Sequence, residues 1–184
     1  LGAVAGSLAA GWLLIPNFGL FATTAAAAAL NLLVAASSFL LSRLPPPPVV
    51  EEPGPPAPRW IFPAYALSGI AALACEVAWT RGLILAFGSS VYAFSLVLAC
   101  FIFGLSAGGA IAARFARAAR NPGALFAMLS IAVAILAAAS VPLLQLLPAA
   151  MMRSWAASRS FSGVAFAQLG FAAIVVTPPA MAMG

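Results

Sequence analysis

The sequence predicts an all-α fold, a polytopic transmembrane bundle of about six helices. Of its 184 residues, 65% are hydrophobic and only 6% are charged, whereas soluble domains carry about 25% charged residues. Several apolar runs reach the roughly 20 residues that a spanning helix needs. Most arginines lie in the short connections between these runs, as is usual in multi-pass membrane proteins. We therefore expect a lipid bilayer to surround most of the chain.

The apolar segments fall into two groups. Residues 1–43 contain two segments, at 1–15 and 20–41, joined by a turn at 16–19. Residues 44–60 hold eight prolines and are expected to form a linker, because proline lacks an amide donor and resists helix formation. Residues 61–184 contain four further segments, at 61–87, 91–113, 124–147 and 161–183, with a polar link at 148–160.

The charges indicate an orientation in the membrane. The net charge is +5, but the cations are spread over separate loops, so we expect no nucleic-acid partner, which would need clustered cations on a wet surface. Of the seven arginines in the connections, Arg153 and Arg159 are expected on one side of the membrane and the other five on the opposite side. The positive-inside rule places the richer side in the cytoplasm of a bacterial inner membrane. The arginines on that side are Arg43, Arg59, Arg114, Arg117 and Arg120.

The sequence lacks the residues of a soluble catalytic site. It contains no His and no Asp, and both Cys75 and Cys100 lie inside apolar runs. Zinc, haem and iron–sulfur sites need clusters of His or Cys ligands. Acid–base chemistry needs a positioned pair of titratable groups. We therefore expect no catalytic residue, metal site or cofactor, and any enzymatic activity would lie outside these residues.

Glycines spaced four residues apart predict close helix packing. They occur as Gly2 and Gly6 in the first segment and as Gly104 and Gly108 in the fourth. Small residues at this spacing form a flat strip along which another helix can approach closely. The strips suit packing within this chain or against a partner chain, and the sequence does not distinguish the two.

Three amide side chains lie at or near membrane depth. An amide without a partner in hydrocarbon costs several kcal/mol, so each should form a hydrogen bond across helices. A role in a substrate path is the alternative. These residues are Asn31, Gln145 and Gln168.

One charged group of residues lies deep in a predicted span. Glu76 is about 15 residues into the third segment, and Arg81 follows it by about 7.5 Å along the helix axis. Thr80 lies on the same face as Glu76, four residues away. Charged residues at this depth are costly and indicate a function. The candidates are a polar network that fixes helix register and a site where Glu76 meets a cation or a proton.

The segment around Glu76 resembles a known family. Residues 67–81, which end in Glu76-Val77-Ala78-Trp79-Thr80-Arg81, and residues 87–99 resemble the membrane domain of the fused major-facilitator/spermidine-synthase family. Residues 1–32 resemble the end of a preceding repeat of that unit, and residues 177–184 its proline-and-Met-Gly segment. The sequence departs from the family at Cys75, where an aromatic residue is expected.

The resemblance implies a major-facilitator-like arrangement of helices and a small cationic substrate such as a polyamine. The soluble aminopropyltransferase domain of that family uses Asp residues, which this sequence lacks. We therefore expect a fragment of a longer protein without that domain. The first hypothesis is an integral membrane domain with a polyamine- or cation-related transport or binding role. The alternative is a non-catalytic structural or accessory subunit that packs with other membrane subunits; a membrane-embedded enzyme is the least favoured.

Overall fold

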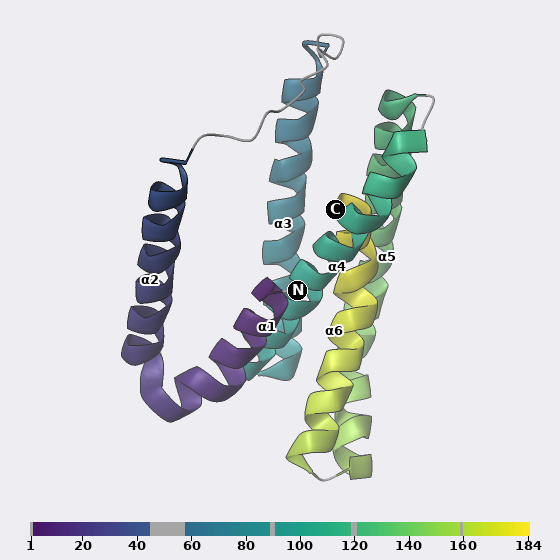
Figure 1. Cartoon of the computed structure of the whole chain (residues 1–184). Helices are drawn as coiled ribbons and strands as arrows, with labels where there is room; N and C mark the ends of the chain where they lie inside the picture. Colours follow the sequence, from purple (N-terminus) through teal and green to yellow (C-terminus); the bar gives the residue numbers. More distant parts are fainter. Residues whose placement is uncertain (1, 45–57, 89–90, 119–120, 159) are drawn as a thin grey trace.

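The computed structural model describes residues 2–44, 58–88, 91–118, 121–158 and 160–184, and in these residues the chain is all-α (Figure 1). The first elements form one continuous run in which a π-helical turn, η1, interrupts the α-helix. The elements are α1 (Gly2–Ala9), η1 (Ala10–Leu14), α2 (Ile15–Leu41), α3 (Ile61–Phe87), α4 (Val91–Ala118), α5 (Pro122–Ser158) and α6 (Phe161–Met183).

The described residues form five helices that are long and apolar enough to cross a membrane. The predicted number of six is wrong, because the first two expected segments form a single run from Gly2 to Leu41. Pro16 lies in the first turn of α2, directly after η1, where it lacks the N–H that would donate to the preceding turn. Gly19 then takes φ 78° and ψ 170°, so it bends the run instead of ending it, and α1 and α2 diverge from this bend (Figure 1).

Side chains satisfy the backbone around this bend. The Asn17 amide donates to the Leu13 carbonyl oxygen at 2.6 Å. The Thr23 hydroxyl donates to the Gly19 carbonyl oxygen at 2.8 Å. Backbone carbonyls that lose their helical partners in a membrane need such substitutes. The residues around Pro16, whose composition predicts a turn, therefore form a bend within one helical run.

Helix α5 is longer than expected. It continues through Pro142 and Pro148 to Ser158. The prediction of a non-helical link at 148–160 is therefore wrong for residues 148–158, which are helical. Its 37 residues span about 55 Å at 1.5 Å per residue, while the hydrocarbon core is about 30 Å thick. Helix α6 likewise continues through Pro178 and Pro179 to Met183.

The core of the molecule lies among α3, α4, α5 and α6. The most extensive contact joins α4 to α6, and the next joins α5 to α6. Helix α1 packs against α4, whereas α2 is exposed along almost its whole length, with Thr23 its one buried residue. The buried cluster consists of Trp79, Leu83, Val97, Cys100, Phe101, Leu147, Ala172, Val175, Val176 and Ala180.

The helices alternate in direction as the sequence predicts. The end of α2 and the start of α3 lie at the same end of the molecule as the connection between α4 and α5 (Figure 1). The connections from α3 to α4 and from α5 to α6 lie at the opposite end. Most of the predicted linker, residues 45–57 with Glu51 and Glu52, lies outside the described residues, as do Arg120 and Arg159.

Candidate functional site

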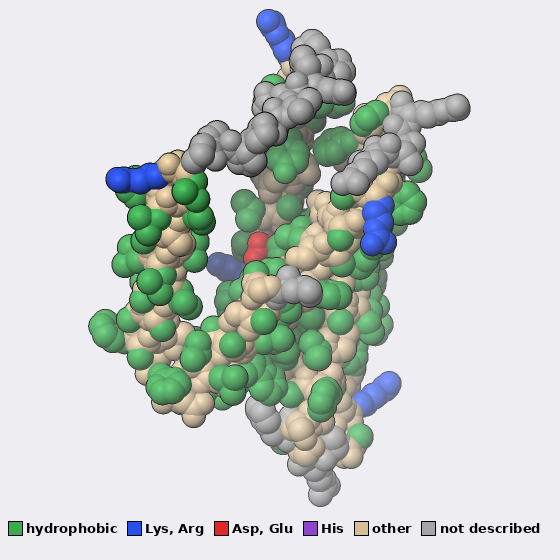
Figure 2. All heavy atoms as spheres, viewed as in Figure 1, with side chains coloured by type: hydrophobic (Ala, Val, Ile, Leu, Met, Phe, Trp, Pro, Cys, Tyr) green, Lys and Arg blue, Asp and Glu red, His purple; other side chains and the backbone are tan. Residues whose placement is uncertain are grey.

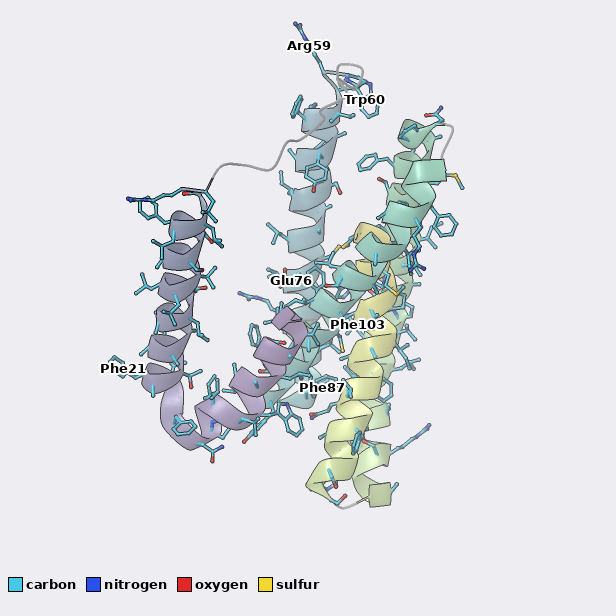
Figure 3. The ribbon with its side chains drawn as sticks, viewed as in Figure 1. Phe21, Arg59, Trp60, Glu76, Phe87 and Phe103 are labelled. Atoms are coloured by element: carbon cyan, nitrogen blue, oxygen red, sulfur yellow. The ribbon has the colours of Figure 1, made fainter. Side chains whose placement is uncertain are left out.

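The charged motif lies on α3, beside the space that separates α3 from α2. Glu76 is half-buried, and its carboxylate is visible at the surface in Figure 2 and labelled in Figure 3. Thr80 is half-buried and Arg81 is exposed. Among the described residues, Glu76 forms no ion pair and accepts no hydrogen bond. The charge of the Glu76 carboxylate is therefore not neutralised by an ion pair or a hydrogen bond within the part of the chain that the structure describes.

Trp79 is the buried member of the same motif. Its side chain is 3% exposed, and its indole nitrogen donates to the Ser140 hydroxyl on α5 at 2.8 Å. That hydroxyl donates in turn to the carbonyl oxygen of Ala137 at 2.6 Å. Because the indole N–H and the hydroxyl both have partners in the core, this pair fixes how α3 sits on α5. It thereby fixes the side of α3 from which Glu76 projects.

Gly104 and Gly108 of α4 lie against the backbone of α6. A Cβ added to Gly104 would lie 2.6 Å from the Cβ of Ala180 and 2.9 Å from the carbonyl oxygen of Thr177. At Gly108 it would overlap the Met181 carbonyl group. The α-hydrogen of each glycine occupies this space, which suits weak Cα–H···O contacts between helices. Here the spaced glycines serve the largest contact of the fold.

Gly2 and Gly6 have different surroundings. No atom lies within 4 Å of a Cβ added at either position. The close approach to α4 occurs in η1, at Gly11, where an added Cβ would overlap the Ser95 side chain and lie 3.4 Å from the Val91 carbonyl oxygen. The Gly2 and Gly6 strip therefore faces away from the described bundle, and its role in packing stays a prediction.

A pocket of about 640 Å³ opens where five helical elements converge, close to the end of α3 at which Figure 3 labels Phe87. Ligand pockets typically enclose about 300–1,000 Å³. The sequence did not predict this pocket, although most of its aromatic residues lie near the ends of the predicted segments. It is lined by Trp12, Ala86, Phe87, Tyr92, Met151, Met152, Trp155, Val164, Ala165 and Gln168.

Two contacts shape this pocket. The Trp12 and Tyr92 rings meet edge to face, with centroids 5.4 Å apart and an interplanar angle of 78°. The Gln168 amide donates to the Phe87 carbonyl oxygen at 3.4 Å. The expected cross-helix hydrogen bond of Gln168 is therefore confirmed. Asn31 and Gln145 are exposed, and no side-chain hydrogen bond joins either to another described residue.

The helices define the general class of this protein, although they do not define a family. With five long apolar helices and large hydrophobic side chains exposed on nearly all of them, the chain has the structure of a multi-pass membrane protein. Within the described ranges, no three His, Cys, Asp or Glu side chains form a group that could hold a metal ion. The chain matches no family model, no curated protein and no solved structure.

Proposed function

We propose that this chain is a membrane-embedded unit of a larger helical assembly, and that further transmembrane helices pack against its α2–α3 side. The observation that carries the proposal is the Glu76 carboxylate, which lies deep in a predicted span and has no polar partner among the described residues. A carboxylate facing lipid at mid-membrane costs about 2.5–3.5 kcal/mol even on lenient scales. A helix that supplies a donor or a cation would remove this cost.

Helix α2 supports the same proposal. Its apolar side chains are exposed on all faces, including Phe21 at 89% and Leu32 at 71%. Asn31, near its middle, is exposed as well. Polar side chains in membranes commonly join helices by hydrogen bonds, so an exposed amide on an isolated helix favours a protein neighbour over lipid alone.

Photo-crosslinking in native membranes tests this assembly. A benzoylphenylalanine in place of Val77, which is 55% exposed on α3, should crosslink to protein. The same probe in place of Phe166, which is 73% exposed on α6, should crosslink to lipid and serves as the control. Adding Glu76→Leu should remove the protein adduct at position 77. Lipid adducts alone at both positions would contradict the proposal.

The second candidate is the polyamine- or cation-related role of a spermidine-synthase-like membrane domain. The specific observation in its favour is that Glu76 is the one acid in the described ranges and forms no ion pair with a described residue. The resemblance of residues 67–81 and 87–99 to that family also supports it. A carboxylate without an ion pair among the described residues can attract a diffusing ammonium group.

Spermidine binding to the purified chain tests the second candidate. Glu76→Gln keeps the side-chain shape but removes the charge, so it should abolish saturable binding of labelled spermidine, while Glu76→Asp should retain part of it. Arg81→Gln should strengthen binding, since it removes a cation one and a half turns away. Equal binding by wild type and Glu76→Gln would exclude Glu76 as a cation site. That result would not test the assembly proposal, which the crosslinking experiment tests separately.

A further inference from the structure

We infer that the 640 Å³ pocket at the converging helix ends binds an uncharged, flat ring of the quinone class that enters from the membrane. The inference is independent of Glu76, which does not line this pocket. It depends on the residues of the wall, on one polar group and on an unusual helical turn.

The wall is aromatic and uncharged. Trp12, Phe87, Tyr92 and Trp155 supply four rings from four different elements, and Met151 and Met152 supply two thioethers. No Asp, Glu, Lys or Arg belongs to the described lining. A charged ligand would lose its hydration here without gaining a counter-ion, which is costly in an apolar site. Aromatic faces and methionine sulfur atoms instead favour a flat, polarisable ring.

Gln168 gives the pocket a polar group at one side. Its amide uses one N–H on the Phe87 carbonyl oxygen, over a long 3.4 Å contact. A primary amide has a second N–H and a carbonyl oxygen that accepts. A carbonyl at the edge of a bound ring can therefore accept a hydrogen bond from Gln168 while the ring lies among the aromatic side chains.

The π-helical turn η1 positions one wall. Single π-helical turns are rare and occur frequently at functional sites. Gly11 lets this turn approach Ser95 of α4 closely, and the next residue, Trp12, meets the Tyr92 ring. Without the close approach at Gly11, the Trp12 ring would stand away from the pocket.

The mouth of the pocket faces the surroundings of the bundle. Met152 is 71% exposed and Trp155 is 61% exposed, so both flank an entrance on the α5 side. Tryptophan and tyrosine are also enriched at membrane interfaces without binding ligands. The difference here is that rings from separate helices surround a ligand-sized space together with a half-buried amide.

A second pocket provides the control. It has about 480 Å³, lies at the start of α3 and α5, and is lined by Trp60, Tyr65, Phe126 and Asn121 among others. Only two helices and the turn before each contribute to it. If a ligand merely partitions to interfacial aromatic residues, substitutions in either pocket should weaken its binding. If it binds in the first pocket, only substitutions there should weaken its binding.

The test uses the full chain in lipid nanodiscs and labelled decylubiquinone, with empty nanodiscs to measure partitioning. We expect saturable binding of one molecule per chain. Trp155→Leu should weaken it about tenfold by removing an exposed ring. Gln168→Glu should weaken it to at least the same extent, because the carboxylate has the shape of the amide without its donor. Trp60→Leu should leave the affinity unchanged.

Several outcomes would overturn the inference. One is binding no greater than that of empty nanodiscs. Others are wild-type affinity in Trp155→Leu and an equal loss in Trp60→Leu. Displacement of decylubiquinone by tetramethylammonium would show that the rings hold a cation instead. Trp155 is exposed and outside the buried cluster, so its variant should keep the wild-type size-exclusion profile, and a loss of binding there reports on the pocket.

Discussion

The indole nitrogen of Trp79 and the hydroxyl of Ser140 form a 2.8 Å hydrogen bond that joins α3 to α5 in the core. Ser140 is 2% exposed, so water cannot replace it. Removing the hydroxyl would leave a buried N–H without its partner. The bond thus makes the position of α3, and of the charged residues on it, depend on a serine on another helix.

Ser140→Ala should therefore destabilise the protein by about 1–3 kcal/mol, the cost of a buried donor left unpaired. The measurement is thermal unfolding in detergent, followed by circular dichroism. Ser130→Ala is the matched control on the same helix, because Ser130 is exposed and its hydroxyl bonds only the Phe126 carbonyl oxygen of its own helix. Equal melting temperatures for the two variants would show that the Trp79 contact contributes nothing.

Gly104→Ala should also destabilise the bundle, although alanine is a better helix former than glycine. The added methyl group would lie 2.6 Å from the Cβ of Ala180, and overpacking of this kind costs about 1–3 kcal/mol. Gly170→Ala is the control, since a Cβ there meets no atom within 4 Å. Unfolding in a denaturing detergent should separate the two variants. A Gly104→Ala protein as stable as Gly170→Ala would mean that α4 and α6 are not in close contact.

Gly19→Ala should change the angle between α1 and α2. At φ 78° and ψ 170°, a residue with a side chain is strained by about 1–3 kcal/mol, so the run should straighten into ordinary helix. Spin labels at Ala5 and Val34 would report the change as a longer and narrower distance distribution. Gly170→Ala with the same labels should leave the distribution as it is. An unchanged distance in Gly19→Ala would place the origin of the bend elsewhere, at Pro16 for instance.

Leu44→Cys and Ser160→Cys should differ in their reaction with an impermeant thiol reagent in intact cells. Both positions are exposed. Leu44 follows the end of α2 and Ser160 precedes the start of α6, and these two helix ends lie at opposite ends of the molecule (Figure 1). The arginine distribution predicts that position 44 is cytoplasmic and stays unlabelled, while position 160 is labelled. The background would carry Cys75→Ala and Cys100→Ala. The reverse pattern of labelling would invert the orientation.

The sequence predicted the helices well because lipid leaves few alternatives. Apolar runs that must satisfy every backbone hydrogen bond internally become helices, so α3 and α6 have their expected limits, while α4 begins as expected and continues beyond residue 113 to Ala118. It failed at Pro16 and Pro148, where a turn and a polar link were predicted and the helical run continues instead. Pro142, Pro148 and Pro178 all lie inside helices, because packing against neighbours can hold a helix together across a missing donor.

The candidate site was less predictable. Glu76 drew attention because its charge is unusual in an apolar run, while Trp79 three residues later makes the buried contact. No local sequence pattern predicts the aromatic pocket. Trp12 and Gln168 are far apart in sequence, and they line the same pocket because their helices converge. Spacing within one segment predicts which residues share a face, but not which faces of different helices surround a cavity.

The contact between α4 and α6 constrains how the protein is made. Helix α5 separates the two in sequence, so while the ribosome is still producing α5, Gly104 and Gly108 do not yet have their α6 neighbours. The core closes when α6 enters the bilayer and its Ala180 turn settles against Gly104. Until then α3 and α4 depend on their own hydrophobicity, and a defect in α6 would leave the Gly104 and Gly108 face of α4 without its neighbour.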